Sequence, residues 1–367
     1  MPGEPSLFSA ADYTFMAEAI RLAEKGLYTT SPNPRVGCVI VKNHQIIGRG
    51  WHEKAGQPHA EINALKQATT EVKGSTVYVT LEPCCHYGRT PPCTNALINA
   101  GIAKLIIAAQ DPNPRVAGKG IQQLRAAGIK VQYGLLEAQA NQLNIGFVSR
   151  MARQRPWITV KIASSLDGKI ALANGKSQWI TGEAARTDVH RLRARSCAIL
   201  TGINTVKQDD PELSVRYIQT TRQPLRVILD NRLEIATNAK VLQKPGSLIF
   251  TTLQDNQKID SLSEKGAQVI VLPSPTGKLN LVEVMSTLAE LEINELFVEA
   301  GSTLNGALIE SRLVDEIIIY CAPIVLGNHA QSMLNLPELA SLSQKWQLEI
   351  KEIGKVGSDI KITAKLI

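Results

Sequence analysis

The sequence predicts an α/β protein made of two domains, and three observations lead to this prediction. The chain has 367 residues, more than one typical domain needs. Helical and strand-like runs alternate up to Ala127, whereas from Trp157 onward short runs are apolar on both faces, as buried parallel strands are. A basic, proline-terminated segment at 151–156 separates the two patterns. We therefore expect domains at residues 1–150 and 151–367.

The composition is that of a globular chain with neither a membrane span nor a dense basic block. Apolar residues make up 44% of the chain, and the formal net charge of +7 is too diffuse to demand a nucleic-acid surface. The longest apolar run, 317–326, is too short to cross a bilayer, and the first residues lack the regions of a signal peptide. The six cysteines do not form a disulfide framework, which suits a reducing compartment. We expect a cytoplasmic protein that binds a small molecule, and neither nucleic acid nor a membrane.

In the first domain we expect a helix, a hairpin and then alternating helices and strands. The first helix places Phe15, Ala19 and Leu22 on one side, and Gly26 ends it. The expected elements are a helix at 12–25, strands at 38–41 and 46–50, a helix at 59–68, a strand at 76–80, a helix at 92–100, a strand at 104–109 and a helix at 118–127. A further short helix is possible at 141–150.

In the second domain we expect an open, doubly wound parallel sheet. Its strands are predicted at 157–163, 198–201, 226–229, 248–251, 268–272, 295–299 and 316–321. In such sheets ligands lie beyond the carboxyl ends of the strands. A helix at 183–195 carries Arg186, Arg191, Arg193 and Arg195, and we interpret most of these as a solvated face.

Two short stretches of the first domain carry the residues of a metal site. Catalytic Zn²⁺ usually has three protein ligands and keeps a fourth position for water, and His59, Cys84 and Cys93 supply three. Glu61 is then free to move protons. An H-x-E followed by P-C-x-x-C is the signature of the zinc-dependent base deaminases, although here eight residues separate the two cysteines. The pattern predicts catalytic zinc and a hydrolytic deamination.

Two alternatives stay open from the residues alone. Cys85 and His86 are rival ligands, and a closed site that binds either one would make the zinc structural and the chain a binding or regulatory protein. A deaminase of a nucleoside or of tRNA, fused to an unrelated domain, is the second alternative. Against it, aromatic residues make up only 4% of the chain, whereas base-flipping and single-strand binders stack bases on aromatic side chains.

The chain resembles the bifunctional deaminase–reductase family of riboflavin biosynthesis over nearly its whole length. In the first domain the resemblance rests on SPNPRVG at 31–37, GWH at 50–52, HAE at 59–61, EPC at 82–84, GRTPPC at 88–93 and DPNP at 111–114. The long insert before Cys93 is this family's form of the cysteine motif. The resemblance implies a cytidine-deaminase-like three-layer domain followed by a doubly wound domain like that of dihydrofolate reductase.

The implied activity is a deamination followed by a reduction. One catalytic Zn²⁺ per chain would serve the deamination of a diaminopyrimidinone that carries a ribosylamino 5′-phosphate. NADPH would then reduce the ribosyl group to ribityl. The phosphorylated pyrimidine would be bound by Asn33, His52, His86, Arg89 and Asp111. A homo-oligomer, dimer or tetramer, is expected from the apolar C-terminal strands.

In the second domain the resemblance rests on KIASSLDGKI at 161–170, SQWIT at 177–181, TGINTV at 201–206 and DDPEL at 209–213. It implies that the cofactor is contacted by Ala163, Trp179, Thr205, Asp209 and Gly301. It implies that the substrate is contacted by Ser177, Arg193, Leu213, Arg216 and Glu299.

Two further expectations come from the residues of the second domain themselves. Gly301, Ser302 and Thr303 lie where a strand ends and a helix opens, so backbone N–H groups there can approach a phosphate of the cofactor. No G-x-G-x-x-G fingerprint is present in the sequence, which disfavours a Rossmann dinucleotide site. Lys161 and Glu299 lie in buried strands, where an ionic group needs a partner or a function. We predict that these two assist proton transfer to the opening sugar ring.

Overall fold

A computed structural model describes residues 7–87, 91–114 and 116–367. The chain separates into two compact units, Met1–Gln154 and Arg155–Ile367. Residue 150, where the sequence predicts the domain boundary, lies within helix α6 (Ile145–Arg153). Each unit is described by itself below. Among the described residues, no helix combines the length and the apolar character needed to cross a bilayer.

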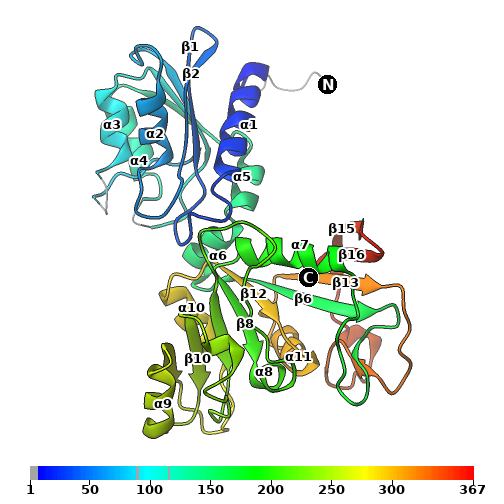
Figure 1. Cartoon of the computed structure of the whole chain (residues 1–367). Helices are drawn as coiled ribbons and strands as arrows, with labels where there is room; N and C mark the ends of the chain where they lie inside the picture. The colour runs from blue at the N-terminus through cyan, green and yellow to red at the C-terminus, as the bar shows by residue number, and fades with distance from the viewer. Residues whose placement is uncertain (1–6, 88–90, 115) are drawn as a thin grey trace. The chain divides into compact units, whose positions relative to one another are not determined.

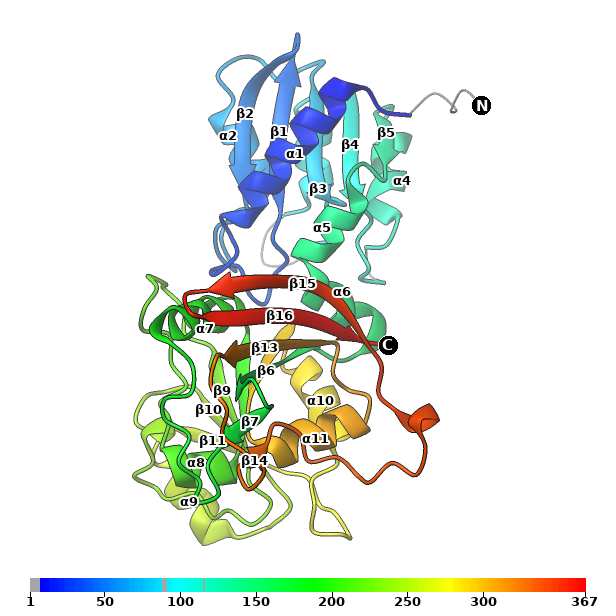
Figure 2. The ribbon, with the colours of Figure 1, turned by 90° about the vertical axis from the view of Figure 1, so that its right-hand side faces the viewer.

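The first unit is built on a mixed five-stranded sheet in the order β2-β1-β3-β4-β5 (Figure 2). Strand β1 runs antiparallel to both β2 and β3, whereas β3, β4 and β5 are parallel. The strands are β1 (Gly37–Lys42), β2 (Gln45–Trp51), β3 (Thr76–Leu81), β4 (Lys104–Ala109) and β5 (Lys130–Tyr133). The sequence predicted the first four of these strands but not β5.

Helices cover both faces of this sheet and complete the expected three layers. Helices α1 and α5 pack on one face, and α2, α3 and α4 pack on the other (Figures 1 and 2). Each face of the sheet carries its own buried hydrophobic cluster, because side chains alternate between the two faces along a strand. In β3, Val77 and Val79 belong to the cluster under α2, α3 and α4, whereas Tyr78 belongs to the cluster under α1 and α5. The helices are α1 (Ala10–Glu24), α2 (Ala60–Gln67), α3 (Cys93–Asn99), α4 (Lys119–Ala126) and α5 (Glu137–Leu143).

Two glycines let helices lie directly on the sheet. A Cβ at Gly37 would lie 1.9 Å from the carbonyl oxygen of Ala19 in α1. A Cβ at Gly50 would lie 2.3 Å from the carbonyl oxygen of Ala60, the first residue of α2. Only glycine permits these approaches. Gly50 therefore fixes how closely the start of α2, which follows His59, sits against β2.

The second unit is built on a nine-stranded sheet in the order β11-β10-β9-β8-β12-β6-β13-β16-β15. From β11 to β13 neighbouring strands are parallel, and an antiparallel hairpin, β15–β16, extends the sheet beyond β13 (Figure 2). The strands are β6 (Trp157–Ser165), β8 (Ala198–Gly202), β9 (Leu225–Leu229), β10 (Ser247–Thr251), β11 (Ala267–Val271), β12 (Glu295–Glu299), β13 (Glu316–Ala322), β15 (Leu348–Val356) and β16 (Asp359–Leu366). The predicted parallel sheet is confirmed.

Helices again lie on the two faces of the sheet. Buried residues of α10 and α11 join the core cluster on one face, and residues of α7, α8 and α9 join the cluster on the other. The helices are α7 (Glu183–Arg195), α8 (Ile203–Asp209), α9 (Asn256–Ser263), α10 (Leu281–Glu290) and α11 (Ser302–Glu310), with short 3₁₀ turns at Lys240–Leu242 and Leu342–Gln344. A separate two-stranded ribbon pairs β7 (Lys169–Ala171) with β14 (Gln331–Ser332).

Candidate active sites

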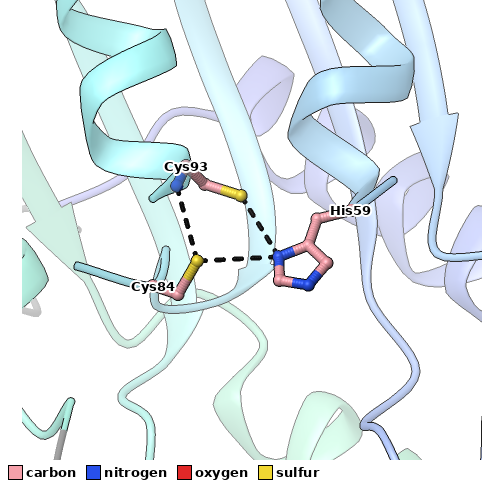
Figure 3. Close-up of side chains that lie close together, drawn as sticks. All are labelled: His59, Cys84 and Cys93. Atoms are coloured by element: carbon pink, nitrogen blue, oxygen red, sulfur yellow. Dashed lines mark hydrogen bonds between the residues drawn. The ribbon is translucent and has the colours of Figure 1, made fainter. Parts of the chain in front are cut away.

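Three side chains of the first unit meet between the start of two helices and the end of a strand. His59 is the residue before α2, Cys84 follows β3, and Cys93 is the first residue of α3. The Nδ1 atom of His59 lies 3.2 Å from Sγ of Cys93 and 3.6 Å from Sγ of Cys84 (Figure 3). The backbone N–H of Cys93 donates to Sγ of Cys84 at 3.4 Å. One imidazole nitrogen and two sulfurs therefore converge on one point.

This donor set fits a zinc ion. The three ligand atoms lie within 4.8 Å of one another, and imidazole with two thiolates is a common zinc combination. Hydrogen bonds from the Cys93 thiol and from His59 lower the pKa of Cys84 to about 4, against the effect of burial, so a thiolate is available. Among the described residues, neither Cys85 nor His86 belongs to this cluster.

Glu61 lies in the first turn of α2 and is buried beside this cluster, with a fractional exposure of 3%. Burial raises its pKa to about 7, and the neighbouring Cys84 adds to the rise. A carboxyl group with a pKa near neutrality can both accept and give up a proton. The position and the electrostatics are those of a general acid–base group.

Asn33 and His52 form a hydrogen-bonded pair next to His59. The amide nitrogen of Asn33 lies 3.1 Å from Nε2 of His52, and Nδ1 of His52 lies 3.2 Å from the carbonyl oxygen of Pro58. The rings of His52 and His59 meet edge to face with centroids 5.4 Å apart. Burial lowers the pKa of His52, so the ring is neutral at pH 7.

The backbone next to Asn33 is hydrogen-bonded to residues more than 100 positions later in the chain. The side chain of Asn144, between α5 and α6, accepts from the N–H of Arg35 at 2.7 Å and donates to the carbonyl oxygen of Arg35 at 2.9 Å. The guanidinium of Arg35 donates to the carbonyl oxygen of Leu143 at 2.7 Å. The end of the first unit therefore anchors the loop that carries Asn33.

Glu82, a residue to which the sequence analysis gave no role, joins the end of β3 to the backbone at Asp111 and at the start of α4. Its buried carboxylate accepts from the backbone N–H groups of Gly118 at 3.0 Å, Ile121 at 3.2 Å and Asp111 at 3.3 Å. It therefore caps the start of α4 and fixes the backbone at Asp111. Its signal in the sequence was an acidic residue placed at a strand end, directly before Pro83 and Cys84.

The remaining predicted residues of this pocket differ in setting. Asp111 is buried, and burial raises its pKa to about 7, although a bond from the N–H of Asn113 opposes the rise. His86 is exposed, and Arg89 lies outside the described residues.

The second unit contains a cavity of about 470 Å³. Ten residues that the sequence analysis placed at the cofactor or the substrate line this one cavity: Ala163, Ser177, Trp179, Arg193, Thr205, Asp209, Leu213, Arg216, Glu299 and Gly301. Lys161 lines it as well. Ser302 and Thr303 occupy the first turn of α11 and, among the described residues, are not part of the lining. The lining includes Lys161 and Ala163 within β6, Glu299 at the carboxyl end of β12 and Thr205 beyond that of β8. The last two lie where ligands are expected in such a sheet.

A buried ionic cluster lies at one wall of this cavity. Nε and Nη2 of Arg193 donate to the two carboxylate oxygens of Glu299 at 2.5 and 3.0 Å, and Nζ of Lys161 lies 4.0 Å from the same carboxylate. Strand register creates the second contact, because Glu299 in β12 pairs with Lys161 in β6. Burial lowers the pKa of Lys161, and Glu299 opposes this. Although burial opposes it, Arg193 keeps the pKa of Glu299 below its usual range, so the carboxylate is charged.

The arginines of α7 correct one interpretation from the sequence. Arg193 is nearly buried, and its Nη1 also donates to the carbonyl oxygen of Ser214 at 3.0 Å. Arg195 pairs with Glu295 at 2.7 Å, whereas Arg191 is largely exposed. The interpretation that most of the four arginines form a solvated face is therefore wrong, because only Arg191 is exposed and β12 presents a carboxylate to Arg193 and to Arg195.

Polar contacts link other predicted residues of the cavity. Ser177 donates to a carboxylate oxygen of Asp209 at 3.3 Å, which ties a predicted substrate contact to a predicted cofactor contact. Arg216 is half-exposed, and its Nη1 donates to the Ser214 hydroxyl at 3.2 Å. Compared with Arg193, Arg216 has the guanidinium that is more open to a phosphate.

His190 and Asn305 are among the lining residues to which the sequence analysis gave no role. His190 is buried, and its Nδ1 accepts from the backbone N–H of Arg216 at 3.0 Å. Its spacing from Arg193 on a predicted helix is three residues, which places both on one face and could have signalled it. Nothing in the sequence distinguished Asn305, because its burial depends on how α11 packs.

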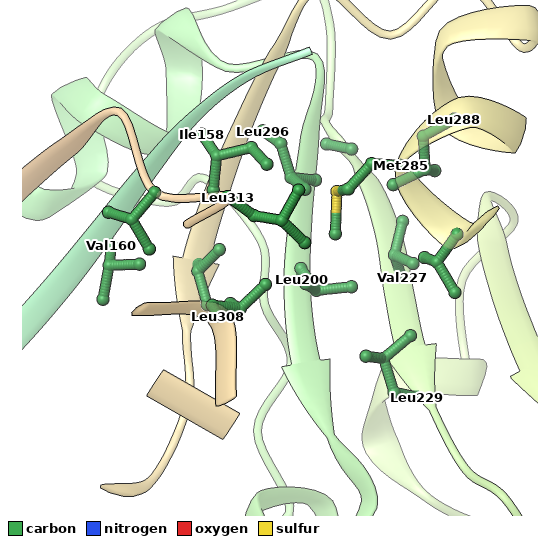
Figure 4. Packing of buried hydrophobic residues seen from close by; sticks show 14 of the residues in the cluster. Ile158, Val160, Leu200, Val227, Leu229, Met285, Leu288, Leu296, Leu308 and Leu313 are labelled. Carbon is green, nitrogen blue, oxygen red and sulfur yellow. The ribbon is translucent and has the colours of Figure 1, made fainter. Parts of the chain in front are cut away.

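The strands that carry the lining residues also contribute to a tightly packed hydrophobic core. Figure 4 shows part of this core, in which buried side chains of three strands and two helices interlock: Ile158, Val160, Leu200, Leu296, Met285, Leu288 and Leu308. Each of these side chains is at most 1% exposed. Strands β6, β8 and β12 are thus a rigid base for the residues at their ends.

Family models match both units. Residues 9–109 match the cytidine and deoxycytidylate deaminase zinc-binding region. Residues 156–362 match the RibD C-terminal domain, which covers more than half of the chain.

Relatives with known names match along almost the whole chain. The riboflavin biosynthesis protein RibD of Escherichia coli is 46% identical over 361 residues, which cover 95% of this chain and 98% of the relative. The protein of the same name from Haemophilus influenzae is 47% identical and covers 97% of this chain and 98% of its own length.

Solved structures agree with these relatives. Acinetobacter baumannii RibD, form 2, has a TM-score of 0.91 at 42% identity and covers 97% of this chain and 99% of its own. A diaminohydroxyphosphoribosylaminopyrimidine deaminase/5-amino-6-(5-phosphoribosylamino)uracil reductase of Thermotoga maritima has a TM-score of 0.86 at 32% identity, with the same coverage of both chains.

Proposed function

The chain belongs to the family of riboflavin biosynthesis proteins that join a deaminase to a reductase, and we propose which of its residues carry each reaction. It is a bifunctional enzyme, a hydrolase in one step and an oxidoreductase in the other. The proposed substrate of the first unit is a diaminopyrimidine ribosyl phosphate, and the second unit acts on the deaminated product. The observation that carries the proposal is the convergence of His59, Cys84 and Cys93 beside the buried Glu61.

In the deamination, Glu61 moves the protons. A zinc ion held by His59, Cys84 and Cys93 would supply a water of lowered pKa as the nucleophile. The Glu61 carboxylate takes a proton from that water and gives it to a ring nitrogen, which makes the attacked carbon more electrophilic. A second proton then passes through Glu61 to the departing amino group. The C–N bond breaks, ammonia leaves, and a carbonyl group replaces the amine.

We propose that the pyrimidine lies between the Asn33 loop and Asp111. The backbone near both residues is fixed by buried contacts, near Asn33 by the bonds between Arg35 and Asn144 and at Asp111 by Glu82. His86 and Arg89 are proposed for the phosphate, because both follow Cys84 closely in the sequence and can donate to phosphate oxygens.

In the reduction, we propose that Lys161 supplies the proton. NADPH, when bound, would supply the hydride that reaches the ribose carbon attached to the exocyclic amino nitrogen of the pyrimidine. As the bond from that carbon to the ring oxygen breaks, the oxygen takes a proton from Lys161. Burial favours this transfer because it disfavours the charged form of the lysine. Glu299, held by Arg193, orients the ammonium group.

The other lining residues are proposed to bind the two ligands. The proposed cofactor contacts are Ala163, Trp179, Thr205, Asp209 and Gly301, with the first turn of α11 at Ser302 and Thr303 facing a cofactor phosphate. The proposed substrate contacts are Ser177, Leu213, Arg216 and Glu299. Arg216 is the proposed phosphate ligand, since its guanidinium is half-exposed at the cavity.

The test uses the zinc-loaded full chain with the diaminopyrimidine ribosyl phosphate and NADPH. Wild-type protein should release ammonia and then consume NADPH. Glu61→Gln should do neither, should keep its zinc, and should consume NADPH once already deaminated substrate is added. Glu53→Gln, which changes an exposed glutamate of the same unit, is the matched control and should behave as wild type. Loss of zinc in Glu61→Gln, or normal ammonia release, would contradict the role of Glu61.

Two further proposals concern the setting of the protein. All six cysteines are free thiols, which supports a reducing compartment such as the cytoplasm.

Edge strand β15 exposes Leu348, Ile350 and Ile353, which supports a homo-oligomer, a dimer or a tetramer. Light scattering of Ile353→Lys against wild type tests the second proposal, and an unchanged mass would reject this strand as the contact.

A further inference from the structure

Three groups beside the zinc ligands form one chain of hydrogen bonds. It runs from the carbonyl oxygen of Pro58 through the ring of His52 to the amide of Asn33, over 3.2 and 3.1 Å. We propose that His52 is a positioning residue, which fixes the Asn33 amide so that its oxygen, and not its nitrogen, faces the substrate. The deaminase pocket then selects a pyrimidine that presents an N–H donor to Asn33. This inference rests on the proposed deaminase function of the first unit.

The orientation follows from the carbonyl group at the start of the chain. A carbonyl oxygen can only accept, so Nδ1 of His52 must carry the hydrogen that it donates to Pro58. In a neutral imidazole the other nitrogen, Nε2, is then an acceptor. The group of Asn33 that faces Nε2 must therefore be the NH₂, which leaves the amide oxygen for a ligand.

Burial protects this arrangement from water. His52 has a fractional exposure of 3%, and the edge-to-face contact with His59 limits rotation of its ring. An asparagine amide in water has no preference between its two flipped orientations, because either end finds a partner. Here one end meets an acceptor with a fixed lone pair, so the flipped amide would place two acceptors against each other.

The backbone of Asn33 is fixed by a different contact. Asn144 satisfies both backbone groups of Arg35, two residues further along the same loop. Asn144 thus places the loop, and His52 sets the rotation of the amide within it. Because Pro58 is directly followed by His59, the turn that places the metal ligand also sets the tautomer of His52.

The proposal specifies a chemical preference. An exocyclic amino group or a ring N–H of an aminopyrimidine can donate to the Asn33 oxygen. A pyrimidine with a carbonyl oxygen or an unprotonated ring nitrogen at that place would be rejected, because two acceptors would meet. In this proposal His52 acts on the substrate through Asn33, since both of its ring nitrogens are engaged within the protein.

The kinetic test compares two replacements that imitate different nitrogens of the ring. The amide of His52→Gln reaches the position of Nε2 and can still accept from Asn33, whereas His52→Asn reaches only the position of Nδ1. We expect His52→Gln to stay within roughly threefold of wild type in deaminase kcat/KM and His52→Asn to lose roughly tenfold or more, mainly through KM. The reductase activity of both variants, measured with deaminated substrate, should be unchanged. Equal losses in the two variants would overturn the proposal.

A double-mutant cycle separates positioning from a general structural role. If His52 acts through Asn33, then His52→Asn should cause no further loss of kcat/KM in an Asn33→Ala background. Multiplying losses would show that the two residues act independently and would overturn the proposal.

A spectroscopic test needs no substrate. In zinc-loaded full chain with ¹⁵N-labelled histidine, the His52 signals, assigned by their disappearance in His52→Asn, should show a hydrogen on Nδ1 and none on Nε2. A hydrogen on Nε2 would overturn the proposal. This result is independent of the deaminase assay, so a wild type that releases no ammonia would refute the proposed function and leave the His52 result to stand by itself.

Discussion

The deaminase pocket and the reductase cavity are built from residues at very different distances along the chain. His59 and Cys93 are 34 residues apart, and the loops that carry them need only meet at one metal-sized point. Arg193 and Glu299 are 106 residues apart, and Lys161 lies on yet another strand. The first site depends on ligands at the starts of two helices, and the second depends on the register of a parallel sheet. The ligands of a compact metal motif can therefore be grouped from their spacing in a sequence, whereas the sequence marks Lys161 and Glu299 as buried charges but does not give the strand register that pairs them.

The two sites also balance charge differently. The first uses imidazole and thiolate ligands whose charge would be balanced by the metal that they bind. The second holds one carboxylate between a guanidinium and an ammonium group within the protein itself. If this distinction is right, metal removal should affect only the first site, and changes of buried charge should affect only the second.

Removal of zinc should give the largest and most selective effect. Treatment of the full chain with a chelator should lower ammonia release by about three orders of magnitude or more, because the nucleophilic water loses its activation. NADPH consumption with deaminated substrate should be unchanged. Parallel assays on chelated and zinc-restored protein provide the measurement. A parallel fall in both activities would show that the two sites are not separable in this way.

Loss of the buried carboxylate should give the next largest effect, this time in the second unit. Glu299→Gln leaves Arg193 and Lys161 facing each other without a counter-charge. We expect a loss of about 3–5 kcal/mol in the free energy of unfolding and of about two orders of magnitude in reductase kcat. Glu295→Gln is the matched control, because it removes the partner of Arg195 between the same helix and strand, where that arginine is 32% exposed. Denaturant unfolding with both assays measures this, and equal losses in the two variants would mean that the cavity cluster has no special role.

The pH dependence of the reductase should reveal the buried lysine. Burial disfavours the charged form of Lys161, so its pKa lies below the ordinary value, and Glu299 opposes this shift. As the pH rises through that pKa the proton donor is lost, and reductase kcat should fall by about tenfold per pH unit. Lys161→Arg cannot release its proton and should give a low rate without this alkaline limb. An alkaline limb that persists in Lys161→Arg would assign the titration to another group.

The smallest effect is expected from the carboxylate that caps α4. Glu82→Gln turns one acceptor oxygen into an NH₂ group, which then faces either the backbone N–H groups of Gly118 and Asp111 or that of Ile121. The first unit should lose about 1–2 kcal/mol of stability, and the deaminase KM should rise severalfold as the backbone at Asp111 shifts. Glu137→Gln, at an exposed position in the first turn of α5, is the matched control. A reductase change in Glu82→Gln would contradict the separation of the two sites.

Local patterns predicted most of the fold. Apart from β5, the parallel strands of both units follow from short apolar runs, because such strands are buried on both faces. The helix at Glu183–Arg195 was predicted as well. The sequence analysis did not predict hairpin β15–β16. In β15, Leu348, Ile350 and Ile353 are interspersed with charged residues, and the strand is exposed on both faces. Strand β15 is held in the sheet by its pairing with β16, and no local sequence pattern predicts this pairing.

The zinc ligands could be predicted from the sequence, whereas the contacts between the other residues of the two sites could not. His59, Cys84 and Cys93 could be grouped from their spacing, and the structure brings them together. The pairings of His52 with Asn33, Asn144 with Arg35 and Glu82 with three backbone donors could not be foreseen. Each joins segments through one hydrogen-bond geometry, and a sequence alone gives no sign of such geometry. In the reductase, the contact between Lys161 and Glu299 required the strand register.

The hold of Asn144 on the Arg35 backbone limits how the two enzymes can be separated into independent proteins. Asn144 lies after the last strand of the first sheet and only shortly before Arg155, where the second unit begins. A gene split placed directly after β5 would keep every zinc ligand and still release the loop of Asn33. A self-sufficient deaminase has to include α5 and α6. The segment after β5 that contains Asn144 is thus a structural part of the deaminase and not a linker between the two units.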